Sequence, residues 1–231
     1  MIKNSPYTEI THPLFAEQHF HIYNHANGEH NIFFSAENRR YFLRQYNKYM
    51  YDYLHTFAYC LMPNHFHIQV QVYSKAQILL AAKKDFPKGL AKREGINIAN
   101  FETVTELTDS QASHIVSERL RCFFMSYSKA VNKQQKRRGS LFQKYFRRKP
   151  VNTYSYFKGC IAYIHRNPTH HGFVKDWREW EWSSYGRLDI PKETHLQKQR
   201  TIAAFGSLQQ LNGYHNEYKK YAQDEVYWAI D

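Results

Sequence analysis

The sequence contains few cysteines. Cys60, Cys122 and Cys160 are the three thiols among 231 residues, and they lie far apart in the chain. An odd number of widely spaced cysteines with no CxxC pair argues against a disulfide framework. We therefore expect buried thiols in a reducing compartment.

Long apolar runs are absent as well. No stretch approaches 18 uncharged apolar residues, and the opening residues MIKNSPYTEITHP lack the apolar run of a signal peptide. We therefore expect a cytoplasmic protein with no membrane partner. The chain also has no repeat of solenoid length and no low-complexity tract.

Acidic side chains are scarce relative to basic ones. Lys and Arg number 32 against 20 Asp and Glu, which gives a net charge of +12. Such a charge favours a polyanionic partner, because each phosphate that is neutralised releases a counterion. Aromatic residues make up 17% of the chain, and rings among basic groups suit the stacking of unpaired bases. Composition alone leaves open the alternative that the rings form the core and the charge only aids solubility.

Strand-like and helix-like patterns alternate along the chain. Strands are expected at 19–24, 53–61, 65–72 and 141–146, and helices at 35–50, 74–84, 113–135, 153–167 and 207–221. Ser35 and Ser74 are expected to cap the first two of these helices. Pro168 is expected to end the fourth helix at Asn167, because proline disfavours helical geometry in the preceding residue. Residues 85–112 resemble an irregular connection. This order favours an α+β sandwich with a central, mostly antiparallel sheet and flanking helices.

The octet 65–72 is the most informative segment. Side chains alternate faces along a strand, so one face carries His65, His67, Gln69 and Gln71, and the other is apolar. Two imidazoles on one face lie roughly 6.5–7 Å apart at Cα and could share a divalent ion. The alternative is that they are solvent-facing polar side chains. The triplet at 19–21 has the same spacing, which by itself does not choose between the pairs.

The helix expected at 153–167 carries a second candidate group. Tyr163 and Asn167 are four residues apart and therefore lie on one helical face. Such a helix could present a phenol and an amide oxygen together to a site on the sheet. The alternative is a packing role, which most of the 19 tyrosines must have.

Four blocks in the sequence resemble the HUH (His, hydrophobic, His) transposases with a single tyrosine, and are most similar to the REP-associated tyrosine transposases of the transposase IS-like family. In order, the blocks are YCLMPNHFH at 59–67, GSLFQ at 139–143, YIHRNP at 163–168 with Gly172, and WSSY at 182–185. The resemblance implies a ferredoxin-like or RRM-like sandwich. It also implies a transposase domain over 1–185. The remaining residues, 186–231, are basic and rich in Gln, and are expected to form a helical extension of the same domain.

The resemblance assigns roles to individual residues. It implies that His65 and His67 bind Mg²⁺ or Mn²⁺, that Asn167 completes the metal site, and that Tyr163 is the nucleophile. The triplet at 19–21 matches a first-strand segment with no ligand role. The implied reaction is transesterification of single-stranded, hairpin-forming DNA, which gives a 5′-phosphotyrosine and a free 3′-OH for transposition and recombination.

Further roles remain alternatives at this stage. Gln69 could bind phosphate or orient a water, or could be a polar residue of the sheet surface. DNA contact is expected at the basic residues around the second block, which are Arg137, Arg138, Lys144, Arg147, Arg148 and Lys149. A solvated basic loop is the alternative. The resemblance leaves a homodimer open, and a DNA-bound protein would be associated with the nucleoid.

Two other functions fit parts of the sequence. A non-catalytic regulator that binds DNA or RNA hairpins would show the same basic surface. A hydrolytic metallophosphodiesterase would use water in place of the tyrosine, but such sites usually need more carboxylates or histidines than are clustered here.

Overall fold

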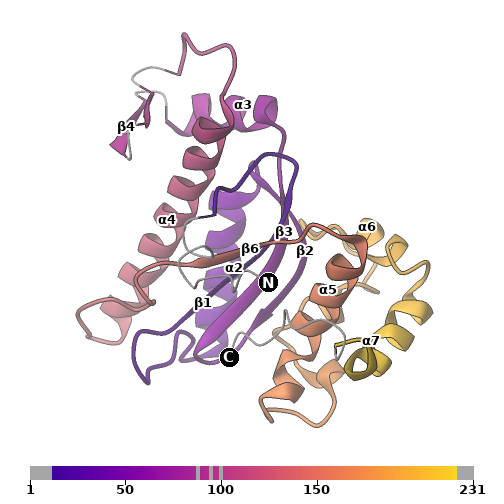
Figure 1. Ribbon diagram of the computed structural model, residues 1–231. Helices are drawn as coiled ribbons and strands as arrows, with labels where there is room; N and C mark the ends of the chain where they lie inside the picture. The colour runs from indigo at the N-terminus through magenta and orange to yellow at the C-terminus, as the bar shows by residue number, and fades with distance from the viewer. Residues whose placement is uncertain (1–11, 87–88, 94–95, 99–100, 223–231) are drawn as a thin grey trace, which may run out of the picture.

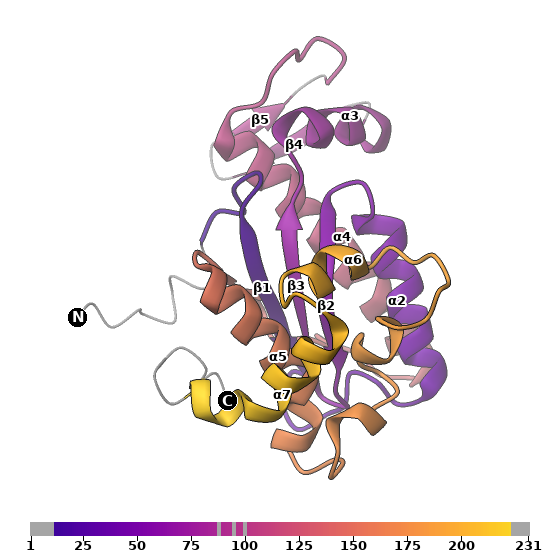
Figure 2. The same ribbon diagram turned by 90° about the vertical axis from the view of Figure 1, so that its right-hand side faces the viewer.

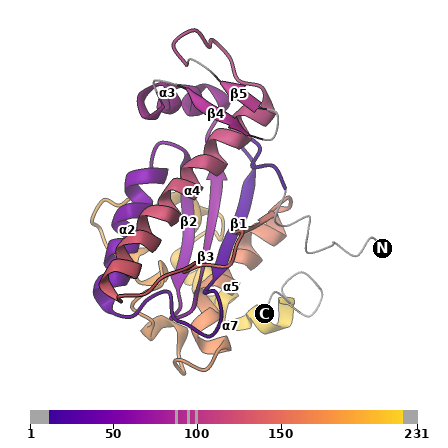
Figure 3. The ribbon, with the colours of Figure 1, turned by 90° about the vertical axis from the view of Figure 1, so that its left-hand side faces the viewer.

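The computed structural model of this protein describes residues 12–86, 89–93, 96–98 and 101–222. At its centre is a sheet with the strand order β2-β3-β1-β6, in which all neighbours are antiparallel. The strands are β1 (His19–His25), β2 (Leu54–Leu61), β3 (His65–Val72) and β6 (Arg147–Pro150). Helices α2 (Ala36–Met50) and α4 (Asp109–Gln134) cover one face, and α5 (Tyr154–His170) covers the other (Figures 1 and 3). This arrangement is ferredoxin-like and confirms the α+β class.

The apolar face of β3 forms the main core with α2 and α4. Phe66 and Val70 are fully buried, and the ring of Phe66 lies 5.1 Å from that of Phe42 on α2. Phe42 in turn meets Phe123 of α4 at 4.9 Å. Burial of each such side chain stabilises the fold by roughly 1.5–3 kcal/mol. This apolar layer therefore holds the sheet in place, and the polar side chains of β3 lie on the opposite face of the sheet.

Helix starts follow their capping residues. Ser35 caps α2 and Ser74 caps α3 (Lys75–Asp85), both as expected. Helix α4 begins at Asp109, earlier than the expected residue 113, because Thr108 and Gln111 form a reciprocal capping box there.

The segment 85–112 is more ordered than the sequence suggested. It contains β4 (Leu90–Arg93) and β5 (Ile96–Ile98), which pair as a small antiparallel sheet, so the expectation of an irregular connection is wrong. Strands this short give too few alternations to stand out in the sequence. Phe101 follows them and is fully buried.

The last strand of the sheet lies later than expected. Residues 141–146 are not a strand; Leu141 and Phe142 are instead buried in the core, where the ring of Phe142 lies 5.2 Å from that of Phe124. The strand is β6, and it occupies the sheet edge. Charged side chains are common on edge strands, because they discourage pairing with another chain.

Helix α5 also runs further than expected. It continues through Pro168 to His170, so Asn167 is not its last residue. Pro168 lies in the final turn, where the loss of one backbone hydrogen bond does not interrupt a longer helix. The helix ends where Gly172 takes a positive φ of 72° and the Phe173 N–H donates to the Pro168 carbonyl.

The C-terminal part packs on the outer side of α5. Two 3-10 turns (Trp177–Glu179 and Tyr185–Arg187) are followed by α6 (Lys198–Ala203) and α7 (Leu208–Ala222), and α7 lies against α5 (Figure 2). The helix expected at 207–221 is therefore present. None of the described helices is long and apolar enough to cross a membrane.

Candidate metal and tyrosine site

The histidine face of β3 is covered by α5 and not by solvent (Figure 2). His65, His67 and Gln69 are 2%, 0% and 0% exposed. The interpretation of these residues as solvent-facing strand polars is therefore wrong. Burial of polar side chains costs free energy unless they find partners, so their partners define the site.

His65 has an amide oxygen at each ring nitrogen. Its Nδ1 lies 2.8 Å from Oδ1 of Asn64, and its Nε2 lies 2.9 Å from Oδ1 of Asn167. A neutral imidazole carries one proton, so donation from Nδ1 to Asn64 leaves a lone pair on Nε2. That lone pair then faces the Asn167 oxygen, as two ligands of one cation would. Neighbouring ligands at about 2.1 Å from an octahedral ion are separated by about 3 Å.

His67 forms a hydrogen bond with a third histidine, His21 of β1. Its Nδ1 lies 2.9 Å from Nε2 of His21, while its buried Nε2 has no hydrogen-bond partner among the described residues. Burial, and next the neighbouring imidazoles, hold the pKa of His67 well below its usual value. Burial also lowers the pKa of His21 to about 3. Both rings are neutral at pH 7, which is the metal-binding form of imidazole.

Tyr163 packs against the same ring. Its centroid lies 5.3 Å from that of His67, with the planes at 82°, and 5.9 Å from that of His21. Asn167 follows on the same helix, and Tyr163 is 6% exposed. One helix therefore brings a phenol and an amide to two imidazoles of one strand, and the structure places all four predicted residues together.

The donor set fits a divalent ion. In the part of the chain that is described, no group of three or more His, Cys, Asp and Glu side chains could hold a metal. The candidate donors here are two imidazoles of β3 and the amide oxygen of Asn167, which is not one of those side-chain types. The Nε2 of His67, which has no hydrogen-bond partner among the described residues, is the second imidazole donor. The two histidine rings lie 5.1 Å apart. If these three side chains bound an ion, coordination positions would remain for other ligands.

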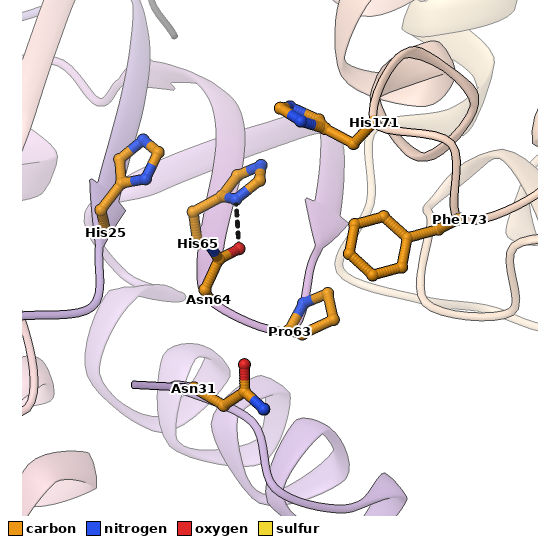
Figure 4. A pocket seen from close by; sticks show the side chains of 7 residues that line it. All are labelled: His25, Asn31, Pro63, Asn64, His65, His171 and Phe173. Atoms are coloured by element: carbon orange, nitrogen blue, oxygen red, sulfur yellow. Dashed lines mark hydrogen bonds between the residues drawn. The ribbon is translucent and has the colours of Figure 1, made fainter. Parts of the chain in front are cut away.

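A pocket of about 610 Å³ opens beside His65 (Figure 4). Its other lining residues come from the end of β1, the loop between β1 and α2, the turn between β2 and β3, and the segment after α5. They are His25, Asn31, Pro63, Asn64, His171 and Phe173. The ring of His65 stacks on that of His25 at 4.8 Å and meets that of His171 at 4.9 Å. The lining does not include His67 or Tyr163, so the pocket reaches one edge of the site only.

Gln69 ties the sheet to α5. Its amide nitrogen donates to the Phe157 carbonyl at 3.3 Å, and the side chain is fully buried. The structure therefore gives Gln69 a hydrogen bond that joins β3 to α5.

The six basic residues that were expected to contact DNA lie on both faces of the central sheet and in a loop. In the pairing of β6 with β1, Lys149 lies opposite His21 and Arg147 lies opposite Tyr23. The side chains of Lys149 and Arg147 therefore lie on the histidine face of the sheet. Arg148 lies on the opposite face, where its guanidinium donates to Ser117 of α4 at 2.8 Å. The three others belong to the loop between α4 and β6, and are Arg137, Arg138 and Lys144.

His21 is the site residue that sequence reasoning missed. The triplet at 19–21 was assigned only to a first strand, yet His21 contacts His67 directly. The sequence does indicate that His21 lies on the polar face of its strand, because alternation places it with His19 and away from Phe20. The missing information was the pairing of β1 with β3, which sets Tyr23 opposite His67 and His21 opposite Gln69.

Comparison with known proteins gives a structural match. No family model and no curated protein matches the chain. A solved structure of a REP-associated tyrosine transposase bound to a REP hairpin aligns over 76% of this chain and 80% of its own, at 15% identity and a TM-score of 0.48. The match is to the same kind of protein that the four sequence blocks resemble.

Proposed function

We propose that this chain cuts and rejoins single-stranded, hairpin-forming DNA by transesterification, with Tyr163 as the nucleophile. The observation that carries the proposal is the meeting of four groups in one buried site. Tyr163 contacts the ring of His67, and Asn167 lies 2.9 Å from His65. Beside these contacts the buried Nε2 of His67 has no hydrogen-bond partner among the described residues, which supports a ligand role for that nitrogen.

In the proposed reaction the Tyr163 oxygen attacks the scissile phosphorus. The phenol loses its proton, a P–O bond to tyrosine forms, and the bond to the 3′ oxygen breaks and that oxygen takes up a proton. A 5′-phosphotyrosine and a free 3′-OH result, and attack by another 3′-OH reverses the step without a nucleotide cofactor. His65, His67 and Asn167 would hold Mg²⁺ or Mn²⁺, which when bound would polarise the phosphate and offset its developing charge.

The site is closed in the present conformation. Tyr163 is 6% exposed and Asn167 is fully buried, so the proposed reaction requires a rearrangement that opens the site to a DNA backbone. The pocket beside His65 provides the open edge from which the strand would enter (Figure 4). Movements of this kind occur on the microsecond to millisecond timescale.

Arg147 and Lys149 are proposed to hold DNA phosphates beside the site, because β6 places both on the histidine face. Replacement of both by glutamine is expected to weaken binding to single-stranded DNA. The plot of log affinity against log salt should become shallower by about 1.4, since each phosphate contact contributes about 0.7 to its steepness on single strands. Fluorescence anisotropy over a KCl series measures this slope.

The matched control for this prediction is Arg148→Gln. Its guanidinium donates to Ser117 on the opposite face, so the slope should stay as in the wild type. Equal slopes for the double variant and the wild type would show that the DNA follows another path.

The proposal as a whole is tested with wild-type protein, Mn²⁺ and a pool of single-stranded hairpins with randomised flanks. DNA labelled at its 3′ end should become attached to the protein on a denaturing gel. DNA labelled at its 5′ end should be released as a shorter fragment that a polymerase can extend. Cleavage without attachment would favour the metallophosphodiesterase, and binding without cleavage would favour the regulator.

A further inference from the structure

We infer that His21 is a positioning residue, which accepts the Nδ1 proton of His67 and so keeps the Nε2 lone pair of His67 directed at the cation. This inference rests on the proposed function for the presence of a cation. It extends that function by placing a required group on β1, outside the two-histidine motif.

The geometry of the pair supports the inference. Nε2 of His21 lies 2.9 Å from Nδ1 of His67, and both side chains are 0% exposed. The ring of His21 is itself held by stacking on Tyr23, with centroids 5.0 Å apart and planes at 30°. A buried ring that is fixed on one side can fix the ring to which it is hydrogen-bonded.

Tautomer choice explains why this contact matters. Of two neutral rings in one hydrogen bond, one donates and the other accepts. If His21 donated, the proton of His67 would sit on Nε2 and that nitrogen could not bind a metal. If His67 donates, its Nε2 carries the lone pair.

His65 has the same arrangement with a different partner. Its Nδ1 faces the side-chain oxygen of Asn64 at 2.8 Å (Figure 4). In both His65 and His67, therefore, Nδ1 lies within hydrogen-bond distance of an acceptor. In metal sites, the loss of a group that is hydrogen-bonded to a ligand in this way typically lowers metal affinity 10- to 100-fold.

The test measures Mn²⁺ binding in the absence of DNA, by titration calorimetry on the full chain. His21→Phe keeps a ring but removes the acceptor, and its affinity for Mn²⁺ should fall by about 10- to 100-fold. His21→Gln offers an amide oxygen to His67 and should recover most of the loss. His19→Gln is the matched control, because His19 is on the same strand and face but packs on Phe57 and Phe157; its affinity should be unchanged.

Each outcome decides the inference. Unchanged affinity in His21→Phe, or equal losses in the Phe and Gln variants, would overturn it without affecting the proposed reaction. A wild type that binds no Mn²⁺ would overturn it together with the metal part of the proposed function. If the Phe variant does not fold, ¹⁵N spectra of the wild type with Zn²⁺ decide, because a proton on Nε2 of His67 would refute the assignment.

Discussion

Tyr163→Phe protein is expected to form no covalent product with DNA and to lose strand cleavage by about 10³-fold or more. The substitution removes the oxygen that attacks phosphorus and keeps the ring. The edge-to-face contact with His67 at 5.3 Å should therefore persist, and the fold with it. Mn²⁺ binding and DNA binding should both be close to wild type, because His65, His67 and Asn167 are unchanged. Gel analysis of 3′-labelled hairpin DNA measures the product directly.

Tyr154→Phe is the control for this result. Tyr154 is the first residue of the same helix and is 61% exposed, and its hydroxyl donates to the Ala204 carbonyl, far from the sheet site. Its covalent product should form at the wild-type rate. If instead Tyr163→Phe still cleaved and Tyr154→Phe did not, the nucleophile would have been assigned to the wrong tyrosine.

Local signals in the sequence were sufficient for the elements that hold the site. Strand β3 was predicted with its observed bounds, because its alternation is strict and a short turn precedes it. Ser35 and Ser74 were predicted as caps because a hydroxyl acts on backbone groups only three residues away. The placement of Tyr163 and Asn167 on one helical face needed nothing more than the helical period.

Long-range packing was the part that sequence could not supply. The role of His21 depends on the register of β1 with β3, which joins residues 46 apart in sequence. The burial of the histidine face depends on α5, which covers it from a segment that follows about 80 residues later. Arg147, Arg148 and Lys149 formed one basic run in the sequence, and only their pairing in β6 assigned them to opposite faces.

Acidification is expected to unfold the protein through its buried histidines. Burial lowers the pKa of His21 and His215 to about 3, and holds the pKa of His67 and His165 well below the usual value. The unfolded chain binds protons on these rings below about pH 6.5 and the folded chain does not, so stability is lost as pH falls from 6.5 towards 3. Each ring contributes up to about 1.4 kcal/mol per pH unit, and the four together contribute up to about 5.6 kcal/mol per pH unit. Against a typical free energy of unfolding of about 5–15 kcal/mol, unfolding without denaturant is expected by about pH 4.

His165 offers the sharpest check on this reasoning. It bridges α5 to α7 through His215 at 2.9 Å and to Ser184 at 2.8 Å, and it lies outside the proposed metal site. Glutamine at 165 can keep one of these hydrogen bonds but takes up no proton, so the decline of unfolding free energy with pH should become shallower by about 1.4 kcal/mol per pH unit. His30→Gln, at an exposed position, should leave the decline unchanged. Urea unfolding followed by tryptophan fluorescence at pH 7.5, 6.0 and 5.0 in EDTA measures both, and a wild-type stability that is constant over this range would show that these rings are not buried in the neutral form.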